Sequence, residues 1–194
     1  MRKPQGQHSK ETQGTLRIIG GQWRSRKLSF KAAEGLRPTS DRIRETLFNW
    51  LSPHIHDASC LDLFGGSGAL GLEALSRYAA HCDFVEADTQ TCRQIREHLI
   101  TLKCNKAAVH CQTAEAYLAS TAVTQQIIFI DPPFHQDLLA PTIAALAKQH
   151  LANGTLIYVE TAANEPLPAL PENWYIDKDK RAGNVSYRLI SVHA

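Results

Sequence analysis

The chain has 194 residues, of which 43% are hydrophobic and 21% charged. The length suits one α/β domain. The composition is typical of a globular protein and not of a disordered, collagenous or coiled-coil one. No apolar stretch approaches the roughly 20 residues of a membrane span, and no signal peptide is recognisable. The five cysteines lack C-x-x-C spacing, which argues against a disulfide framework or a zinc site and favours a cytoplasmic protein.

The charge is unevenly distributed along the chain. Residues 1–48 carry 11 Lys and Arg against 4 Asp and Glu, a net charge of +7, whereas residues 49–194 carry 10 against 15, a net charge of −5. A concentrated basic segment indicates binding to a polyanion, because cationic side chains displace counterions from phosphates. A solvated tail is the alternative, and charge alone does not decide between the two.

The first elements form a small extension. Residues 1–14 lack periodicity and are predicted to be a flexible basic arm, and residues 15–55 are predicted to form a hairpin and a helix that contact the polyanion. Short strands around a glycine pair at 20–21 favour a basic hairpin. Any of residues 39–41 could cap the helix that follows, and Pro53 should end it. Its polar face should show Arg42, Arg44 and Glu45.

From residue 56 to residue 194 the pattern alternates between strand and helix. The repeated unit predicts a doubly wound, mostly parallel sheet of seven strands that binds ligands at the carboxyl ends of its strands. A final antiparallel hairpin with its turn at 182–184 is typical of Rossmann-like class I methyltransferases. Strands are expected at 60–63, 84–86, 109–111, 127–130, 155–160, 174–176 and 185–192, and helices at 70–78, 91–103, 114–118 and 138–146.

The first motif is a glycine loop at a strand-to-helix turn, Asp62-Leu63-Phe64-Gly65-Gly66-Ser67-Gly68. Glycines there let the backbone approach a ligand, and a helix N-terminus presents unpaired N–H groups. Residues 66–71 also match the G-x-G-x-x-G of nicotinamide dehydrogenases, and this match alone leaves both enzyme classes open. Asp62 favours an aminoacyl nucleoside, because its carboxylate accepts hydrogen bonds from an ammonium or ribose group but repels a diphosphate.

Two later strand ends complete the predicted cofactor site. Glu86 lies about 20 residues further on, where a carboxylate usually binds the ribose hydroxyls of an adenosine cofactor. Thr113 and Ala114 follow the third strand, at the edge where the adenine should lie. The residues predicted to bind S-adenosylmethionine are Asp62, Phe64, Gly65, Gly66, Gly68, Glu86, Thr113 and Ala114.

The second motif, Asp131-Pro132-Pro133-Phe134, closes the fourth predicted strand. Two successive prolines fix φ and remove two N–H donors, so the site becomes a cluster of acceptors. The Asp131 carboxylate and the Pro132 carbonyl can hold both hydrogens of an exocyclic amine and free its delocalised lone pair, while Phe134 supplies a stacking surface. The predicted catalytic residues are Asp131, Pro132, Pro133 and Phe134. This motif favours methylation of a nucleobase nitrogen over hydride transfer.

Histidines and cysteines suggest no further chemistry. His54 and His56, like His110 and Cys111, lack a third partner at a spacing typical of metal ligands. No metal is therefore predicted.

Three segments resemble one bacterial family: Arg17-Ile18-Ile19-Gly20-Gly21-Gln22-Trp23-Arg24, the stretch 35–42 with Leu36-Arg37-Pro38-Thr39, and 44–48. Together with the two motifs they resemble the 16S ribosomal RNA guanine-N2 methyltransferases that modify guanine 966. The resemblance implies S-adenosylmethionine as donor, guanine N2 as acceptor, and an assembled or partly assembled small ribosomal subunit as substrate. The protein is expected to be a monomer. RNA contacts are expected at Arg17, Trp23, Arg24, Arg26, Lys27, Arg37 and Arg42.

Other functions remain possible from the sequence. Another enzyme with the same tetrapeptide would methylate adenine in DNA or glutamine in a protein. An RNA-binding assembly factor with a vestigial cofactor fold is a non-enzymatic alternative, although Asp62 and Asp131 argue against it.

Overall fold

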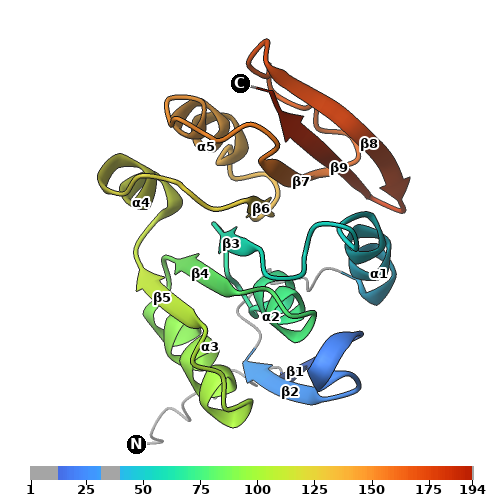
Figure 1. Cartoon of the computed structure of the whole chain (residues 1–194), viewed down its shortest axis with the longest axis vertical. Coiled ribbons are helices and arrows are strands. Elements are labelled where there is room, and N and C mark those ends of the chain that lie inside the picture. Colours follow the sequence, from blue (N-terminus) through green and yellow to red (C-terminus); the bar gives the residue numbers. More distant parts are fainter. Residues whose placement is uncertain (1–12, 32–39, 194) are drawn as a thin grey trace, which may run out of the picture.

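The computed structural model describes residues 13–31 and 40–193. Within them, seven strands form one sheet in the order β5-β4-β3-β6-β7-β9-β8 (Figure 1). The strands are β3 (Ser59–Asp62), β4 (His81–Glu86), β5 (Ala107–Cys111), β6 (Ile127–Ile130), β7 (Leu156–Ala162), β8 (Trp174–Ala182) and β9 (Val185–Val192). The five strands β5, β4, β3, β6 and β7 are parallel to their neighbours, and β9 is antiparallel to both β7 and β8. The prediction of a Rossmann-like methyltransferase sheet is therefore confirmed.

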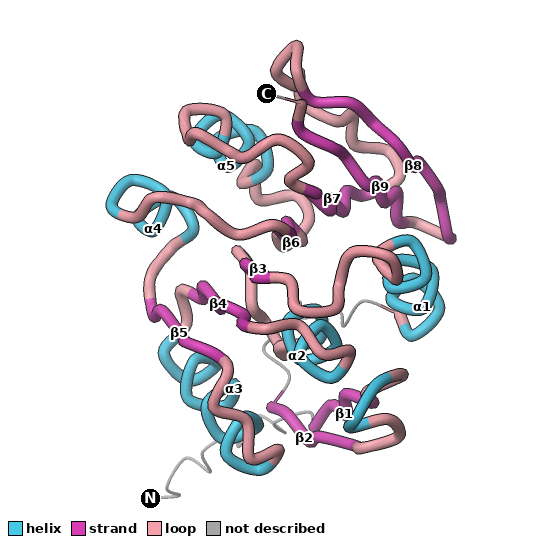
Figure 2. The backbone as a smooth tube through the Cα atoms, viewed as in Figure 1, coloured by secondary structure: helices cyan, strands magenta, loops and turns pink. Residues whose placement is uncertain are grey.

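Helices cover both faces of the sheet. Figures 1 and 2 show α1, α2 and α3 on one face and α4 and α5 on the other. Their bounds are α1 (Asp41–Trp50), α2 (Ala69–Ser76), α3 (Thr89–Thr101), α4 (Ala114–Ser120) and α5 (Leu139–Leu146). Side-chain caps begin three of them, since Ser40, Asp88 and Thr113 each accept the backbone N–H three residues on.

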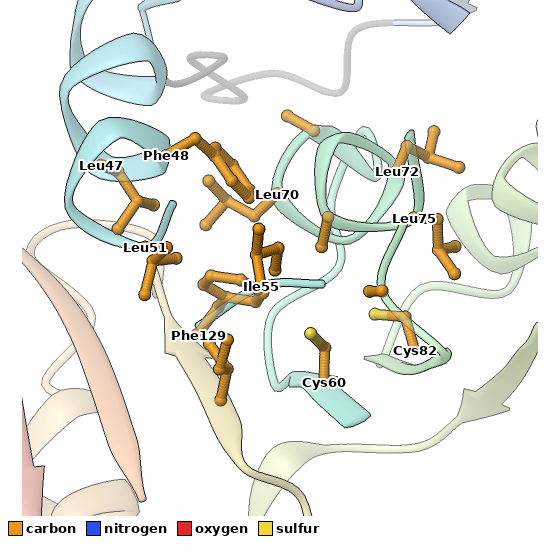
Figure 3. Close-up of a cluster of buried hydrophobic side chains, with 14 of the residues drawn as sticks. Leu47, Phe48, Leu51, Ile55, Cys60, Leu70, Leu72, Leu75, Cys82 and Phe129 are labelled. Atoms are coloured by element: carbon orange, nitrogen blue, oxygen red, sulfur yellow. The ribbon is translucent and has the colours of Figure 1, made fainter. Parts of the chain in front are cut away.

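Two apolar layers hold the helices against the sheet. On the α1–α3 face, Leu47 and Phe48 of α1 pack with Leu70 of α2 and with Phe129 of β6, and all four are buried (Figure 3). On the α4–α5 face, a second cluster includes Ile143 and the inner residues of β6 and β7. Both faces of β6 and β7 are therefore buried, and residues 127–130 and 156–159 form continuous apolar runs in the sequence.

The hairpin of the extension forms a second, small sheet. Strand β1 (Gln13–Arg17) pairs antiparallel with β2 (Lys27–Lys31), and a 3₁₀ turn η1 (Gly21–Trp23) lies between them. Leu16, Ile18, Leu28 and Phe30 are buried in the same apolar cluster as α1 and α2. The hairpin therefore contributes apolar side chains to the core that it shares with α1 and α2.

Buried polar groups fasten this hairpin to α2. Glu73 is 1% exposed, and its carboxylate accepts the backbone N–H groups of Ile19 and Gly20, each at 2.8 Å. Ser76 Oγ donates to the Gly20 carbonyl at 2.6 Å and accepts the Trp23 N–H at 3.0 Å. Buried polar groups of the hairpin and of α2 thus find their hydrogen-bond partners in each other.

Arg44 corrects the prediction for α1. The sequence places it on the polar face, but the structure buries it to 1% exposure. Its guanidinium donates to the Arg17 carbonyl at 2.9 Å and to Asp41, and Nη1 lies 3.7 Å from Glu73 Oε2. A buried carboxylate on α2 attracts this cation inward, which the spacing of apolar residues cannot show.

The predicted elements all form, with boundaries that shift by a few residues at most ends, and the hairpin strand expected at 174–176 extends to Ala182. The arm expected at 1–14 lies outside the described residues except for its last two positions, which begin β1. In the described part of the chain, no helix is both long and apolar enough to cross a membrane.

Candidate active site

The glycine loop joins β3 to α2 in a tight, hydrogen-bonded turn. Gly65 N–H donates to the Val85 carbonyl at 2.8 Å, and Gly68 N–H donates to the Gly65 carbonyl at 2.7 Å. Gly68 is the N-cap of α2 and has φ +81°, a conformation that favours glycine. A Cβ at Gly65 would come within 3.0 Å of Ile95 Cδ1. The loop therefore lies close against β4 and α3.

Gly71 explains the apparent dehydrogenase pattern. It lies inside α2, where a Cβ would clash with the ring of Phe84 on β4. Its N–H also donates to Asp62 Oδ2 at 3.1 Å. The last glycine of the pattern thus serves helix–strand packing, a need that both enzyme classes share.

Asp62, the charged residue that begins the glycine-loop motif, is buried, with an exposure of 1%. Burial raises the pKa of Asp62 to about 7, hydrogen bonding from the backbone of Gly71 and Phe64 opposes this, and the negative charges of Asp131 and Glu86 add to it. Its Oδ1 accepts no hydrogen bond from the described residues. A buried acceptor without a partner is costly, so this atom fits a site completed by a ligand that donates a hydrogen or carries positive charge.

Glu86 ends β4 and contacts the loop directly. Its Oε2 accepts the Gly66 N–H at 2.8 Å, and its Oε1 accepts the Asp88 N–H at 2.8 Å. Each carboxylate oxygen has a second lone pair. The group can therefore hold the loop and still accept hydrogen bonds from ribose hydroxyls, the role predicted for it.

Thr113 and Ala114 lie further along the same edge. Thr113 follows β5 and caps α4 by accepting the Ala116 N–H at 3.2 Å, while Ala114 begins that helix and is buried. Strand β5 pairs with β4, with Cys111 opposite Glu86. Thr113 and Ala114 therefore follow the strand next to the one that Glu86 ends, at the position where the adenine is predicted to bind.

The second motif follows β6, the neighbour of β3. In their register Asp62 lies opposite Phe129, two residues before Asp131, and the charge of Asp131 acts on Asp62. Pro132 is buried, Pro133 is exposed and Phe134 is partly buried. The two predicted motifs therefore meet at the carboxyl ends of adjacent parallel strands, where open α/β sheets bind ligands.

A second carboxylate lies beside this motif and was missed by the sequence reasoning. Glu160 of β7 is 2% exposed and accepts the hydroxyl hydrogen of Tyr158 at 2.7 Å. Strand β7 pairs in parallel with β6, with Val159 opposite Ile130. Burial, together with the charge of Glu160, raises the pKa of the Tyr158 hydroxyl. In the sequence, Glu160 is only the polar end of an apolar run.

The loop after Phe134 is conformationally unusual. His135 has φ +60° and Asp137 has φ +52°, values that residues with a side chain adopt infrequently. His135 Nδ1 lies 2.7 Å from Glu165 Oε1, and its backbone N–H donates to the same oxygen at 3.2 Å. Glu165 therefore fixes the turn through which the chain leaves the tetrapeptide.

The basic residues of the extension are mostly on the surface. Arg24, Lys27 and Arg42 are exposed, and so is Arg26, whose guanidinium donates to the Thr101 carbonyl at 3.3 Å. Three predicted contacts differ from this pattern: Arg17 is exposed but paired with Asp41 at 2.9 Å, Trp23 is partly buried against the core, and Arg37 lies outside the described residues.

Histidines take part in local pairs. His110 Nε2 lies 2.9 Å from Asp83 Oδ1, and the other oxygen of Asp83 accepts from Gln125 at 2.8 Å. Among the described residues, no group of three or more His, Cys, Asp or Glu side chains is arranged to hold a metal ion.

The sheet order, the glycine loop and the antiparallel terminal hairpin define a Rossmann-like methyltransferase. A solved structure described as a putative methyltransferase yhhF from Escherichia coli superimposes with a TM-score of 0.85 and 48% identity, over 93% of this chain and 99% of that one.

Sequence comparison then gives the family. Residues 16–191 match the family model described as Conserved hypothetical protein 95, and the chain belongs to that family. It is 50% identical to the ribosomal RNA small subunit methyltransferase D of Escherichia coli (strain K12), over all of this chain and 96% of that protein. The protein of the same name from Haemophilus influenzae is 48% identical over 91% of this chain and 93% of its own length.

Proposed function

We propose that this protein transfers a methyl group from S-adenosylmethionine to the N2 amine of a guanine, guanine 966, in the 16S RNA of the small ribosomal subunit. The observation that carries the proposal is the meeting of the glycine loop and Asp131–Phe134 at the ends of adjacent strands β3 and β6. Full-length identity of 50% to a ribosomal RNA small subunit methyltransferase supports the substrate class. The choice of guanine and of its position follows the family resemblance.

The cofactor would be held by the glycine loop and by two carboxylates. Backbone groups of residues 65–68 line the turn, Asp62 offers the buried Oδ1 to a donor, and Glu86 offers its remaining lone pairs to hydroxyls. When bound, S-adenosylmethionine supplies an electrophilic methyl group on a positively charged sulfur. The negative charges of Asp62 and Glu86 suit a cationic ligand.

The tetrapeptide would prepare the nucleophile. Asp131 and the Pro132 carbonyl accept the two hydrogens of the guanine amine, which draws its nitrogen towards tetrahedral geometry and exposes the lone pair. Phe134 stacks on the base, a contact worth on the order of 1–3 kcal/mol. With the base held in this way, the nitrogen lone pair would be directed at the methyl group of the cofactor, whose transfer leaves S-adenosylhomocysteine, and most of the rate acceleration would come from this placement.

Proton release needs no strong base. Once methylated, the nitrogen is cationic and acidic, and it loses a proton to Asp131 or to water. Asp131 would therefore act first as a hydrogen-bond acceptor and could then take the proton that the nitrogen releases.

The target guanine must be unpaired or flipped out, since its amine is otherwise engaged in a duplex. The exposed cations of the extension, Arg24, Arg26, Lys27 and Arg42, would contact the phosphates around it. We propose that a cytoplasmic monomer acts on an assembled or partly assembled subunit.

The test is methyl transfer from labelled S-adenosylmethionine to four substrates: small-subunit particles lacking the modification, free 16S RNA, duplex DNA and total protein. Label is expected in the particles, at a guanine that mass mapping places at position 966. Label confined to DNA or protein would contradict the proposal and favour one of the other amino-methyltransferase functions. Absence of binding to S-adenosylmethionine in calorimetry would instead favour a non-enzymatic assembly factor.

A further inference from the structure

The turn of the last hairpin lies at the ligand-binding edge of the sheet. Strand β9 runs antiparallel to β7, with Val185 opposite Ala162 at the carboxyl end of β7. Ala182 of β8 pairs with the same Val185. The turn between β8 and β9 therefore stands beside the segment that follows β6, although about 50 residues separate the two in sequence.

A cavity of about 380 Å³ lies between this turn and the end of the tetrapeptide. Its volume is at the lower end of the range for small-molecule sites, roughly 300–1,000 Å³. Phe134 forms part of its wall, and Arg181 and Asn184 contribute from the hairpin. Its lining is completed by His135, Ala162, Ala163 and Asn164.

The polar groups of this cavity are suited to an anion. Arg181 is exposed and donates through Nε to the Gly183 carbonyl at 3.2 Å, which orients the guanidinium at the turn. Two nearby carboxylates have cationic or histidine partners of their own: Asp179 pairs with Arg188 at 3.1 Å, and Glu165 with His135. No ion pair to Arg181 is formed within the described residues.

We propose that this cavity binds the phosphodiester of a nucleotide next to the target base. The inference rests on the proposed function, because Phe134 is both a wall of the cavity and the predicted stacking surface. A base on Phe134 brings the adjoining backbone to the hairpin turn, where the Arg181 guanidinium can bind phosphate oxygens and the Asn164 and Asn184 amides can donate further hydrogen bonds. The hairpin thus adds an RNA contact far from the basic extension in sequence.

The test compares two single-charge variants on one strand. Arg181→Gln removes the cation in the cavity, whereas Lys178→Gln removes an exposed cation of β8 that does not line it. Binding to unmethylated small-subunit particles is measured at several salt concentrations, together with kcat and KM for methylation. Arg181→Lys keeps the positive charge but lacks the planar guanidinium, which can donate two parallel hydrogen bonds. Calorimetry with S-adenosylmethionine checks that the cofactor site of each variant is intact.

Arg181→Gln is expected to weaken particle binding about tenfold and to reduce the slope of log affinity against log salt by about 0.7, the value for one phosphate contact on a single strand. Its KM should rise with kcat changed less than about twofold, and Lys178→Gln should match the wild type. Arg181→Lys should restore the slope with part of the affinity.

Equal effects of Arg181→Gln and Lys178→Gln would overturn the proposal, since the loss would then be one of general charge. Weaker binding with an unchanged salt slope would also overturn it, because the contact would be to a base. The particle-binding comparison does not depend on catalysis. A wild-type protein that binds particles without methylating them would therefore count against the proposed function and leave the test of the cavity intact.

Discussion

Gly66 donates its backbone N–H to Oε2 of Glu86 at 2.8 Å, so the carboxylate that ends β4 holds the glycine loop that follows β3. The same side chain accepts the Asp88 N–H at 2.8 Å. Glu86 therefore couples the shape of the loop to the strand end at which a ribose is predicted to bind.

Replacing Glu86 with Ala should weaken S-adenosylmethionine binding by roughly ten- to a hundredfold. Hydrogen bonds to a charged group contribute about 1.5–3 kcal/mol each, and the variant loses those to the loop as well as those to the ligand. Glu86→Gln, which keeps one acceptor oxygen, should lose less. Calorimetric titration measures both, and equal affinity of Glu86→Ala and the wild type would remove Glu86 from the cofactor site.

Asp131→Ala should abolish methylation while leaving the affinity for S-adenosylmethionine within a few-fold of the wild type. The reason is that Asp131 is predicted to bind the acceptor amine and not the donor. Asp131→Asn is the matched variant, because it retains one acceptor oxygen but cannot take a proton. Single-turnover methylation of small-subunit particles gives the rates, and wild-type turnover by Asp131→Ala would refute the assigned role.

Asp62 should make both stability and cofactor binding depend on pH. Its pKa is about 7 in the folded chain against 3.8 for the ordinary group, so between these values the folded state binds more protons than the unfolded state. The stabilisation associated with protonated Asp62 is full below about pH 4 and is lost as the pH rises through 7.

The size of this loss is on the order of 4 kcal/mol. Relative to the wild type, Asp62→Asn should gain stability as the pH rises from 4 to 7, with no further gain above that range. Urea unfolding at each pH measures the difference. Binding of a cationic cofactor favours ionised Asp62, so affinity for S-adenosylmethionine should rise between pH 6 and 8 in the wild type and stay flat in Asp62→Asn.

Glu73→Ala should destabilise the protein by about 3–5 kcal/mol, because it removes the buried one of the two carboxylates beside the Arg44 guanidinium, the other being Asp41, and also removes the acceptor of two backbone N–H groups. Glu97→Ala, an exposed glutamate of α3, is the control and should lie within about 0.5 kcal/mol of the wild type. Chemical unfolding compares them. A similar small effect of both changes would show that the extension is held by apolar packing alone.

Replacing Arg24, Arg26 and Lys27 together with Gln should weaken RNA binding and flatten its salt dependence, by about 0.7 in slope for each phosphate that the variant no longer binds. The control replaces three exposed lysines elsewhere on the surface, Lys106, Lys148 and Lys178. If the two triple variants bind small-subunit particles alike, the basic extension is a solvated surface and not an RNA contact.

Much of the fold follows from the sequence because its signals are local. Apolar runs bounded by turn residues mark β6 and β7, and capping residues mark the starts of α1 and α4. The meeting of Asp62 with Asp131 could also be predicted, since both residues are at carboxyl ends of strands in a parallel sheet.

The parts that could not be predicted depend on contacts between distant segments. Arg44 reads as a surface residue until Glu73, 29 positions later, is known to lie beneath it. The cavity beside Phe134 likewise needs the register of β9 on β7, which no local pattern specifies. Pairing partners across a sheet are set by the whole chain, so sequence reasoning located the tetrapeptide but not the hairpin next to it.

The place of β9 between β7 and β8 has a consequence for the order of assembly. Strand β8 precedes β9 in the chain, yet its only partner in the described sheet is β9. During synthesis β8 therefore has no strand of this sheet to pair with until β9 has been made. The edge that carries Arg181 is therefore expected to be completed late, after the cofactor loop between β3 and α2 has its neighbours.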